Sequence, residues 1–362
     1  MNSNLDIDKE VRFGKLSITI LIISVIVIIF SFFAPYLFVQ ESIFGIDFSD
    51  KGEIGDTLGG VMNPFIAISG VLLTFLAFYI QFRANRLQRK MFRLELDEQK
   101  IQFKKNQIEN QFYEMLRLHK ENVNEIEVST IKFIFNQSQK EKVEGIIKGR
   151  RVFDFMAKEF EICYYTAKKC FPEATPKICI NEAYGVFFHG LNNENKNKHE
   201  YFKILAGIKD NHEFDNYSDL KSIIKQVLNI EWEYDLNYEL FKGYSTLLAH
   251  YYRHLFQSVK FVVNQPNNLI NYEEKRKYLR ILRAQLSNNE QLMLFYNWLS
   301  NFGKQWENNN NKFFTDYRMI HNIYQALIVP DIKLEELFNI DNDYLKEKNR
   351  DFDPLFEYQD WD

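Results

Sequence analysis

The pattern of apolar and polar positions divides the chain into two long apolar runs and a longer remainder of mixed character. The runs cover residues 16–39 and residues 61–82. A helix needs about 20 apolar residues to cross the hydrocarbon core of a bilayer, and each run is at least that long. A cleaved signal peptide is another explanation of the first run, but the run is too long for one and a second run follows it. The pattern therefore predicts two transmembrane helices followed by a large water-soluble part.

Charged residues flank the two runs unequally. Lys and Arg residues precede the first run and follow the second, whereas the connecting segment, residues 40–60, contains a single Lys and five acidic residues. The basic flanks of transmembrane helices stay in the cytoplasm. We therefore expect residues 1–15 and everything after residue 82 to be cytoplasmic, so that both termini lie inside and residues 40–60 lie outside.

Small and weakly polar residues recur along the second run at alternating steps of three and four. They are Gly60, Asn63, Ala67, Gly70, Thr74 and Ala77. This spacing places them on one face of a helix, and small residues allow two membrane helices to approach closely. The face could pack against the first run of the same chain. Alternatively, it could mediate self-association or line a polar path through an oligomer.

The stretch after the second run, residues 83–124, contains no Gly or Pro that would interrupt a helix. Its apolar residues recur at alternating steps of four and three, as in a heptad repeat. The repeat consists of Leu87, Met91, Leu94, Ile101, Ile108, Phe112 and Met115, with Glu98, Lys105 and His119 at the remaining places. We expect one long helix that leaves the membrane as a stalk. It could form a coiled coil with another copy, or it could pack against the globular part.

The rest of the chain is interpreted as a helical cytoplasmic domain, residues 125–330, and an acidic, aromatic tail, residues 331–362. Helical periodicity, helix-ending Gly and Pro residues, and a capping box formed by Ser287 and Glu290 indicate the elements of the domain. The expected helices are 152–170, 178–191, 220–230, 238–263, 272–286, 291–302, 313–328 and a short one at 333–338, and the best candidate strand is 129–136. The predicted fold class is mostly all-α, with two N-terminal transmembrane helices, a helical stalk and a helical cytoplasmic domain.

Composition adds little to this picture. The net charge is −4 and the basic and acidic residues are mixed, so the chain as a whole shows no bias toward nucleic acid. Cys163, Cys170 and Cys179 fall in the predicted cytoplasmic part, where free thiols are expected. Their spacing does not match a zinc-binding motif.

Six ordered segments of the chain resemble one protein family. They are GDTLGGVMNP at 55–64, LTFLAFYIQ at 73–81, ENQFYEMLRLH at 109–119, GRRVF at 149–153, HYYRHLF at 250–256 and YLRILRAQLS at 278–287. In these segments the chain is similar to the AbiC-like family of phage abortive infection proteins. The resemblance implies a membrane-anchored bacterial protein that limits phage infection. We therefore expect the bacterial inner membrane as its location. It assigns no catalytic residue.

Two histidines within the resembling segments, His250 and His254, are four residues apart and share one face of a predicted helix. This spacing could hold a metal ion, but the glutamate of the zinc-protease motif and an obvious third ligand are missing from the sequence. We therefore interpret the pair as part of the packing or of a buried polar network, and we expect no metal and no cofactor.

Arginines near these histidines suggest a pocket for an anion. The guanidinium group has a planar fork that suits phosphate or carboxylate, and an anion near a helix start also gains from exposed N–H groups. The candidate pocket consists of Arg150, His250, Arg253, His254, Arg280, Arg283 and Gln285. Its ligand would be a nucleotide, an RNA end or an acidic peptide. Alternatively, these arginines form ion pairs inside a helical bundle.

Motifs of common enzymes are absent from the sequence, which has no phosphate-binding loop, no G-x-G-x-x-G and no G-x-S-x-G. The favoured hypothesis is therefore a sensor and effector that is not an enzyme. The cytoplasmic domain would detect a phage component or a nucleotide or RNA signal, and the spans would act on the lipid bilayer, with other copies of the chain as partners. The alternatives are a membrane-tethered enzyme acting on RNA or nucleotides, and a scaffold that recruits another defence factor.

Overall fold

The computed structural model describes residues 14–39, 54–136, 139–191, 199–215, 217, 219–338 and 354–357. The described part contains ten α-helices, a short 3-10 helix and one two-stranded antiparallel sheet. The prediction of a mostly all-α fold is therefore confirmed. The chain divides into two compact units, Met1–Phe103 and Lys104–Asp362, and the division falls within helix α4 (Ile54–Glu125).

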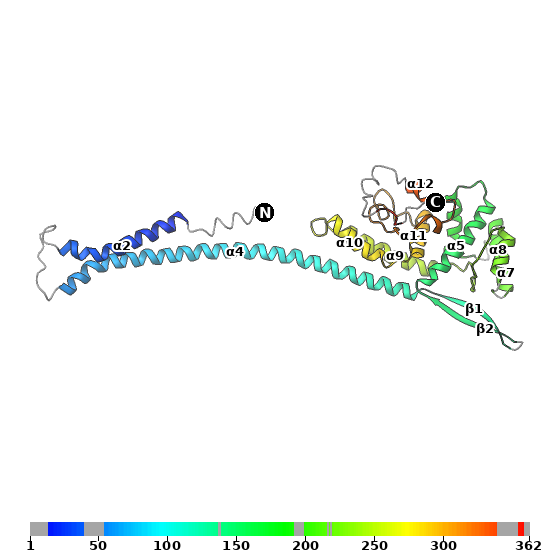
Figure 1. Cartoon of the computed structure of the whole chain (residues 1–362), viewed down its shortest axis with the longest axis horizontal. Coiled ribbons are helices and arrows are strands. Elements are labelled where there is room, and N and C mark those ends of the chain that lie inside the picture. The colour runs from blue at the N-terminus through cyan, green and yellow to red at the C-terminus, as the bar shows by residue number, and fades with distance from the viewer. Residues whose placement is uncertain are drawn as a thin grey trace. The chain divides into compact units, whose positions relative to one another are not determined.

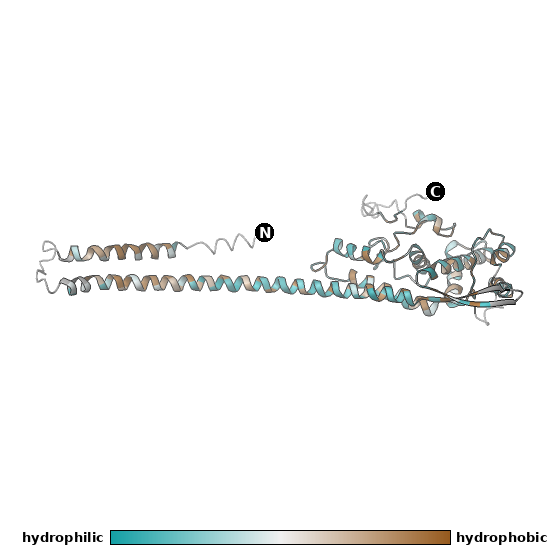
Figure 2. Cartoon of the chain, turned by 60° about the horizontal axis from the view of Figure 1, so that its bottom comes forward, coloured by the Kyte–Doolittle hydropathy of each residue, from teal (hydrophilic) through white to brown (hydrophobic). Residues whose placement is uncertain are grey.

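The first unit contains helix α2 (Lys15–Val39) and the beginning of α4. Both helices are long and apolar enough to cross a membrane. Figure 2 shows that hydrophobic residues are concentrated in α2 and in this part of α4, and most of their large side chains are exposed. The two helices are in contact, since the rings of Phe30 and Phe65 lie 5.1 Å apart between centroids. Such outward-facing apolar side chains suit a lipid environment.

The small-residue face of α4 does not take part in this contact. Ser69 and Leu76 are buried, whereas all six residues of the small-residue face, from Gly60 to Ala77, are exposed. A Cβ atom added at Gly60 or at Gly70 would meet no atom within 4 Å. Within the described residues, α4 therefore leaves this face open for a partner other than α2.

The second unit is built around helix α5 (Arg151–Cys170), which is buried on nearly all sides. The helices that pack against it are α6 (Pro176–His189), α7 (Glu200–Phe214), α8 (Leu220–Leu228) and α11 (Asn288–Leu299). A helix surrounded in this way is expected to be apolar around most of its circumference. Its buried side chains, from Val152 to Ala167, form the centre of the hydrophobic core.

The remaining elements complete the second unit (Figure 1). Helix α9 (Ser245–Val263) packs against α10 (Tyr272–Arg283) and α6. Strand β1 (Glu127–Asn136) pairs with β2 (Gln139–Lys148) in an antiparallel ribbon. After α11 the chain forms the 3-10 helix η1 (Gln325–Leu327) and α12 (Leu334–Phe338). Leu355 and Phe356 of the described C-terminal segment are buried, and Phe356 contacts Phe338.

One predicted helix is wrong. Residues 313–328 form turns and only the short η1, and Arg318 adopts a left-handed backbone with φ +61°. Packing overrides the helical pattern here, because the apolar residues of the segment enter the core without helical periodicity. These residues are Phe313, Phe314, Met319, Ile320 and Ile323.

The helix predicted for residues 238–263 begins later than expected, at Ser245. Phe241 and Gly243 have φ values of +55° and +89°, which a helix cannot include. Helix α7 and strand β2 were not predicted, whereas β1, α5, α6, α8, α10, α11 and α12 lie where the sequence pattern indicated helices or a strand.

Candidate functional site

The most unusual cluster of polar side chains lies where the end of α4 enters the core of the second unit. Phe112, His119 and Val123 of α4 are buried there. The ring of Phe112 lies 5.0 Å from that of Tyr278 in α10, measured between centroids. This apolar face holds the helix end in the domain. It also carries the imidazole of His119 into a site with no solvent exposure.

The imidazole of His119 packs against two side chains of α9. Its centroid is 5.4 Å from the ring of Tyr251 and 6.2 Å from the ring of His254, and the two imidazole planes are within 17° of parallel. Neither ring nitrogen of His119, nor Nδ1 of His254, has a hydrogen-bond partner among the described residues. A buried polar atom without a partner destabilises the fold by about 1–3 kcal/mol. The packing of the domain must offset this loss.

A second titratable side chain, Glu290, lies at the start of α11 and is fully buried. Its carboxylate accepts a hydrogen bond from the backbone N–H of Ser287 at 2.7 Å and one from the hydroxyl of Tyr251 at 3.1 Å. The guanidinium of Arg150 lies 3.4 Å from the same carboxylate and donates to the backbone carbonyl of Gln285. Tyr251 thus joins this hydrogen-bonded network to the ring of His119.

Burial dominates the electrostatics of the cluster. Burial, followed by the electrostatic interactions with His254 and Arg150, lowers the pKa of His119 to about 4. Burial, followed by the charge of His250, lowers the pKa of His254. Burial raises the pKa of Glu290, against the opposing effects of Ser287 and Arg150. The buried imidazole of His119 and the half-buried imidazole of His254 are therefore neutral near pH 7, and each could donate one hydrogen bond and accept another.

The structure brings together only some of the residues predicted to form an anion pocket. Arg150 meets Gln285, although at the backbone carbonyl of Gln285 and not at its side chain. His254 contacts His119, whereas His250 and Arg253 are exposed on α9. Within the described residues, no group of three or more His, Cys, Asp and Glu side chains could hold a metal ion.

Two of the predicted arginines belong to a different basic group at the end of α10. Arg283 donates to the backbone carbonyl of Arg318 at 3.3 Å. Burial, followed by the charges of Arg280 and Arg276, lowers the pKa of Arg283 to about 10. Arg283 therefore lies among other cations.

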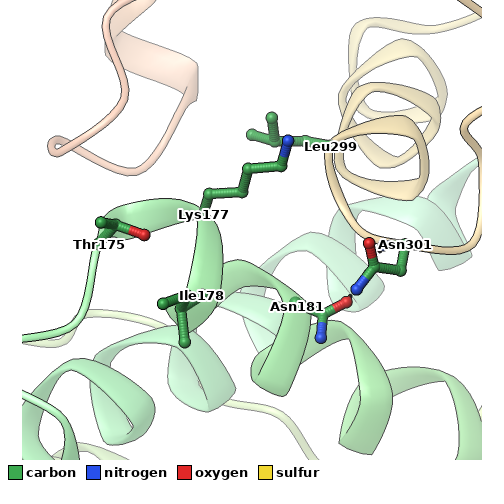
Figure 3. A pocket seen from close by; sticks show the side chains of 6 residues that line it. All are labelled: Thr175, Lys177, Ile178, Asn181, Leu299 and Asn301. Carbon is green, nitrogen blue, oxygen red and sulfur yellow. Dashed lines mark hydrogen bonds between the residues drawn. The ribbon is translucent and has the colours of Figure 1, made fainter.

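A small pocket also lies at the start of α6, and none of the predicted site residues lines it (Figure 3). Its volume is about 210 Å³, and the backbone N–H of Asn301 donates to the side chain of Asn181 there at 3.1 Å. Lys177 extends its side chain along the pocket. Because Thr175, Lys177 and Ile178 are exposed, this hollow is a shallow surface feature.

The sequence did not reveal three members of the cluster as a site. The sequence showed His119 as a polar residue at a seam position of the heptad repeat, and Glu290 as part of a helix cap. Tyr251 lay in one of the segments that resemble the AbiC-like family. The feature of the sequence that could have indicated this site is the histidine at position 119, where the heptad repeat predicts an apolar side chain. Their meeting depends on contacts between distant parts of the chain, which sequence spacing does not show.

Comparison with known proteins bears on this part of the chain. Residues 243–327 match the model of a family described as "Putative phage abortive infection protein". The resemblance inferred from the sequence is thus confirmed, and the match supports a role in phage abortive infection. The matched region contains Tyr251, His254 and Glu290, whereas His119 and Arg150 lie outside it. No curated protein and no solved structure matches the chain.

Proposed function

We propose that this protein is a membrane-anchored bacterial antiphage protein that acts by abortive infection. Its helical cytoplasmic domain detects a phage component, or a nucleotide or RNA signal made during infection. Its two spans are the effector and compromise the inner membrane. Both termini are cytoplasmic, as the basic flanks of the spans indicate.

One observation carries this proposal. Helix α4 contains the second candidate span, and its last turns, which include His119, are buried in the second unit. A ligand that alters the packing of this end would act on the element that also crosses the membrane. Such coupling requires that the ligand bind one of two states of the protein more tightly than the other.

The cluster around His119 is a suitable place for such a change. The imidazole nitrogens of His119 lack hydrogen bonds among the described residues, so the resting arrangement of the cluster is not optimal. A signal that binds to α9 or α11 could shift Tyr251 or Glu290, which contact His119 directly or through one side chain. A small shift could then favour a different packing of the end of α4.

Self-association of the spans is the step that we propose for the effector. The small-residue face of α4 is exposed, and small residues allow close approach of membrane helices. A homo-oligomer that forms or rearranges through this face would perturb the bilayer. Growth of the infected cell would stop before phage replication is complete.

The experiment is a comparison of Gly70→Leu with Ile68→Leu during phage infection. Gly70 belongs to the small-residue face, whereas Ile68 is an exposed apolar residue of the same helix outside this face. Single-cell membrane potential and phage yield are measured at matched expression. We expect depolarisation and protection to be lost in Gly70→Leu and kept in Ile68→Leu.

Two results would contradict the proposal. Unchanged protection in Gly70→Leu would show that close approach of the helices is not needed. Protection with a steady membrane potential would indicate that the cytoplasmic domain acts by itself, as in the tethered-enzyme hypothesis. A chain that begins near Gln81 would then remain active without its spans.

A further inference from the structure

We propose that α4 of one copy packs in parallel and in register against α4 of a second copy, along a row of positions from Asn63 to Glu98 and the neighbouring seam residues up to Ile101. This pairing deepens the proposed function, which rests on association between copies. Three features of α4 within the first unit support it: a continuous row of exposed residues, an apolar seam and the charges beside the seam.

The small-residue face and the heptad seam share one series of positions spaced seven residues apart. A straight α-helix rotates such a series by about 20° per heptad, so the series becomes one continuous line of contact in a left-handed supercoiled pair. Every seventh residue of α4 belongs to a single row, and all members of this row are exposed. They are Asn63, Gly70, Ala77, Ala84, Met91 and Glu98. The first three belong to the small-residue face of the candidate span, and the last two belong to the heptad repeat beyond it. A seven-residue repeat along a helix favours a left-handed supercoil with a partner helix.

Large apolar side chains form the part of the seam beyond the span. Met91, Leu94 and Ile101 are 45%, 43% and 48% exposed. Farther along the same repeat, Phe112 and His119 are buried in the chain's own domain. Within the second unit the domain thus covers the end of the seam, whereas the large apolar seam residues Met91, Leu94 and Ile101 belong to the first unit and are exposed. We therefore assign packing against the globular part to the end of α4, and coiled-coil formation with a second copy to residues 87–101.

The charges beside the seam fit a second copy in parallel orientation. Both copies enter the membrane through the same span, so their helices run in the same direction. In a parallel in-register pair, Lys90 of one copy faces Glu95 of the other, which attracts. The neighbouring flanking pairs set Arg83 and Asp97 opposite glutamines, and these pairs bring no like charges together. The flanking pairs are Arg83 with Gln88, Lys90 with Glu95 and Asp97 with Gln102.

One residue opposes the pairing. Glu98 occupies the seam itself, so two carboxylates would lie at the same level of the pair. A polar residue at such a position fixes the register of a coiled coil and weakens it. The pair is therefore weaker than an entirely apolar seam would make it. Replacing Glu98 with an apolar residue should therefore strengthen the pairing.

Cysteine cross-linking of the full chain in membranes tests the geometry. A disulfide requires Cα atoms about 4.4–6.8 Å apart, a distance that facing seam positions meet in a parallel pair. We expect an oxidant to produce cross-linked dimer from Met91→Cys and none from Leu96→Cys, because Leu96 is exposed on another side of α4. The unsubstituted chain controls for the three native cysteines. Dimer from Leu96→Cys, or no dimer from Met91→Cys, would overturn the pairing.

A second variant pair uses the unfavourable residue. Glu98→Leu should raise the fraction of dimer in detergent, whereas Gln99→Leu, one position away from the seam, should leave it unchanged. Equal effects of the two substitutions would count against the proposed seam. Because these experiments measure association and not protection, intact dimers without protection would refute the proposed function and leave the pairing in place.

Discussion

The buried imidazole of His119 leads to a prediction about the pH dependence of stability. Its pKa is lowered from 6.5 to about 4 in the folded chain, mainly by burial. As the pH falls below 6.5, the unfolded chain binds a proton on this imidazole and the folded chain does not. The contribution of His119 to the free energy of unfolding therefore falls with decreasing pH, until the folded imidazole is protonated near pH 4.

The size of this effect is set by the two pKa values. One pKa unit corresponds to about 1.4 kcal/mol, so lowering the pH from about 8 to about 5 should remove roughly 2 kcal/mol through His119. The substitution His119→Phe keeps a ring in the site and cannot be protonated. It also removes two buried nitrogens that have no partner among the described residues, so stability near pH 8 should be unchanged or higher.

Urea unfolding of the full chain in detergent, monitored by tryptophan fluorescence, measures the effect. All four tryptophans lie between residues 232 and 361, so the signal reports on the second unit. The free energy of unfolding of His119→Phe is compared with that of the unsubstituted chain at each of the two pH values. The difference isolates His119, since other groups titrate equally in both chains. His189→Gln, at a histidine on the surface side of α6, is the matched control. An equal loss of stability on acidification in His119→Phe and the unsubstituted chain would refute the burial of His119 as a neutral base.

Two further predictions concern the core of the second unit. Gly243→Ala should destabilise this core by more than about 2 kcal/mol, because φ of Gly243 is +89° and an added Cβ would lie 2.6 Å from the backbone of Gly190. Gly207→Ala should instead stabilise helix α7 by about 0.5–1 kcal/mol, because an added Cβ there meets open space. Thermal unfolding of the two variants measures both effects. Burial raises the pKa of Glu159 to about 7, so its contribution to stability is present below its unfolded pKa of 4.5 and is lost as the pH rises through 7. Glu159→Gln should abolish this loss, which is about 2.5 kcal/mol between pH 5 and pH 8. An unchanged dependence of the free energy of unfolding on pH, measured by urea unfolding, would contradict it.

The parts of the fold that depend on local sequence were predictable. Helices α2 and α4, which contain the two candidate spans, are indicated by apolar runs, helical spacing and the absence of Gly and Pro over residues 83–124. The short capped helix α11 is indicated by Ser287 and Glu290, which form the capping box that the structure contains. These signals act within a few residues and need no knowledge of the rest of the chain.

The parts that depend on distant contacts were not predictable. The sequence of β2 is polar, and this segment forms a strand because it pairs with β1. The pairing is antiparallel and begins with Glu127 opposite Lys148. Residues 313–328 were expected to form a helix, but they form turns that bury Phe313, Phe314 and other apolar side chains in the core. The candidate site depends on the meeting of α4, α9 and α11, so the sequence could indicate Arg150 and His254 but not the position of His119 between distant elements.

Helix α4 has a consequence for how this chain can change in length. One row of its positions, seven residues apart, passes from small residues in the candidate span, through exposed Met91 and Glu98, to buried Phe112 and His119. Each residue added to a helix rotates the remaining part of that helix by about 100° and advances it by about 1.5 Å. An added residue would thus turn one end of the row away from the other, whereas seven added residues would nearly restore the phase. In the proposed pairing, the length of α4 would therefore be constrained to steps of about one heptad, whereas its sequence could vary on the sides away from the row.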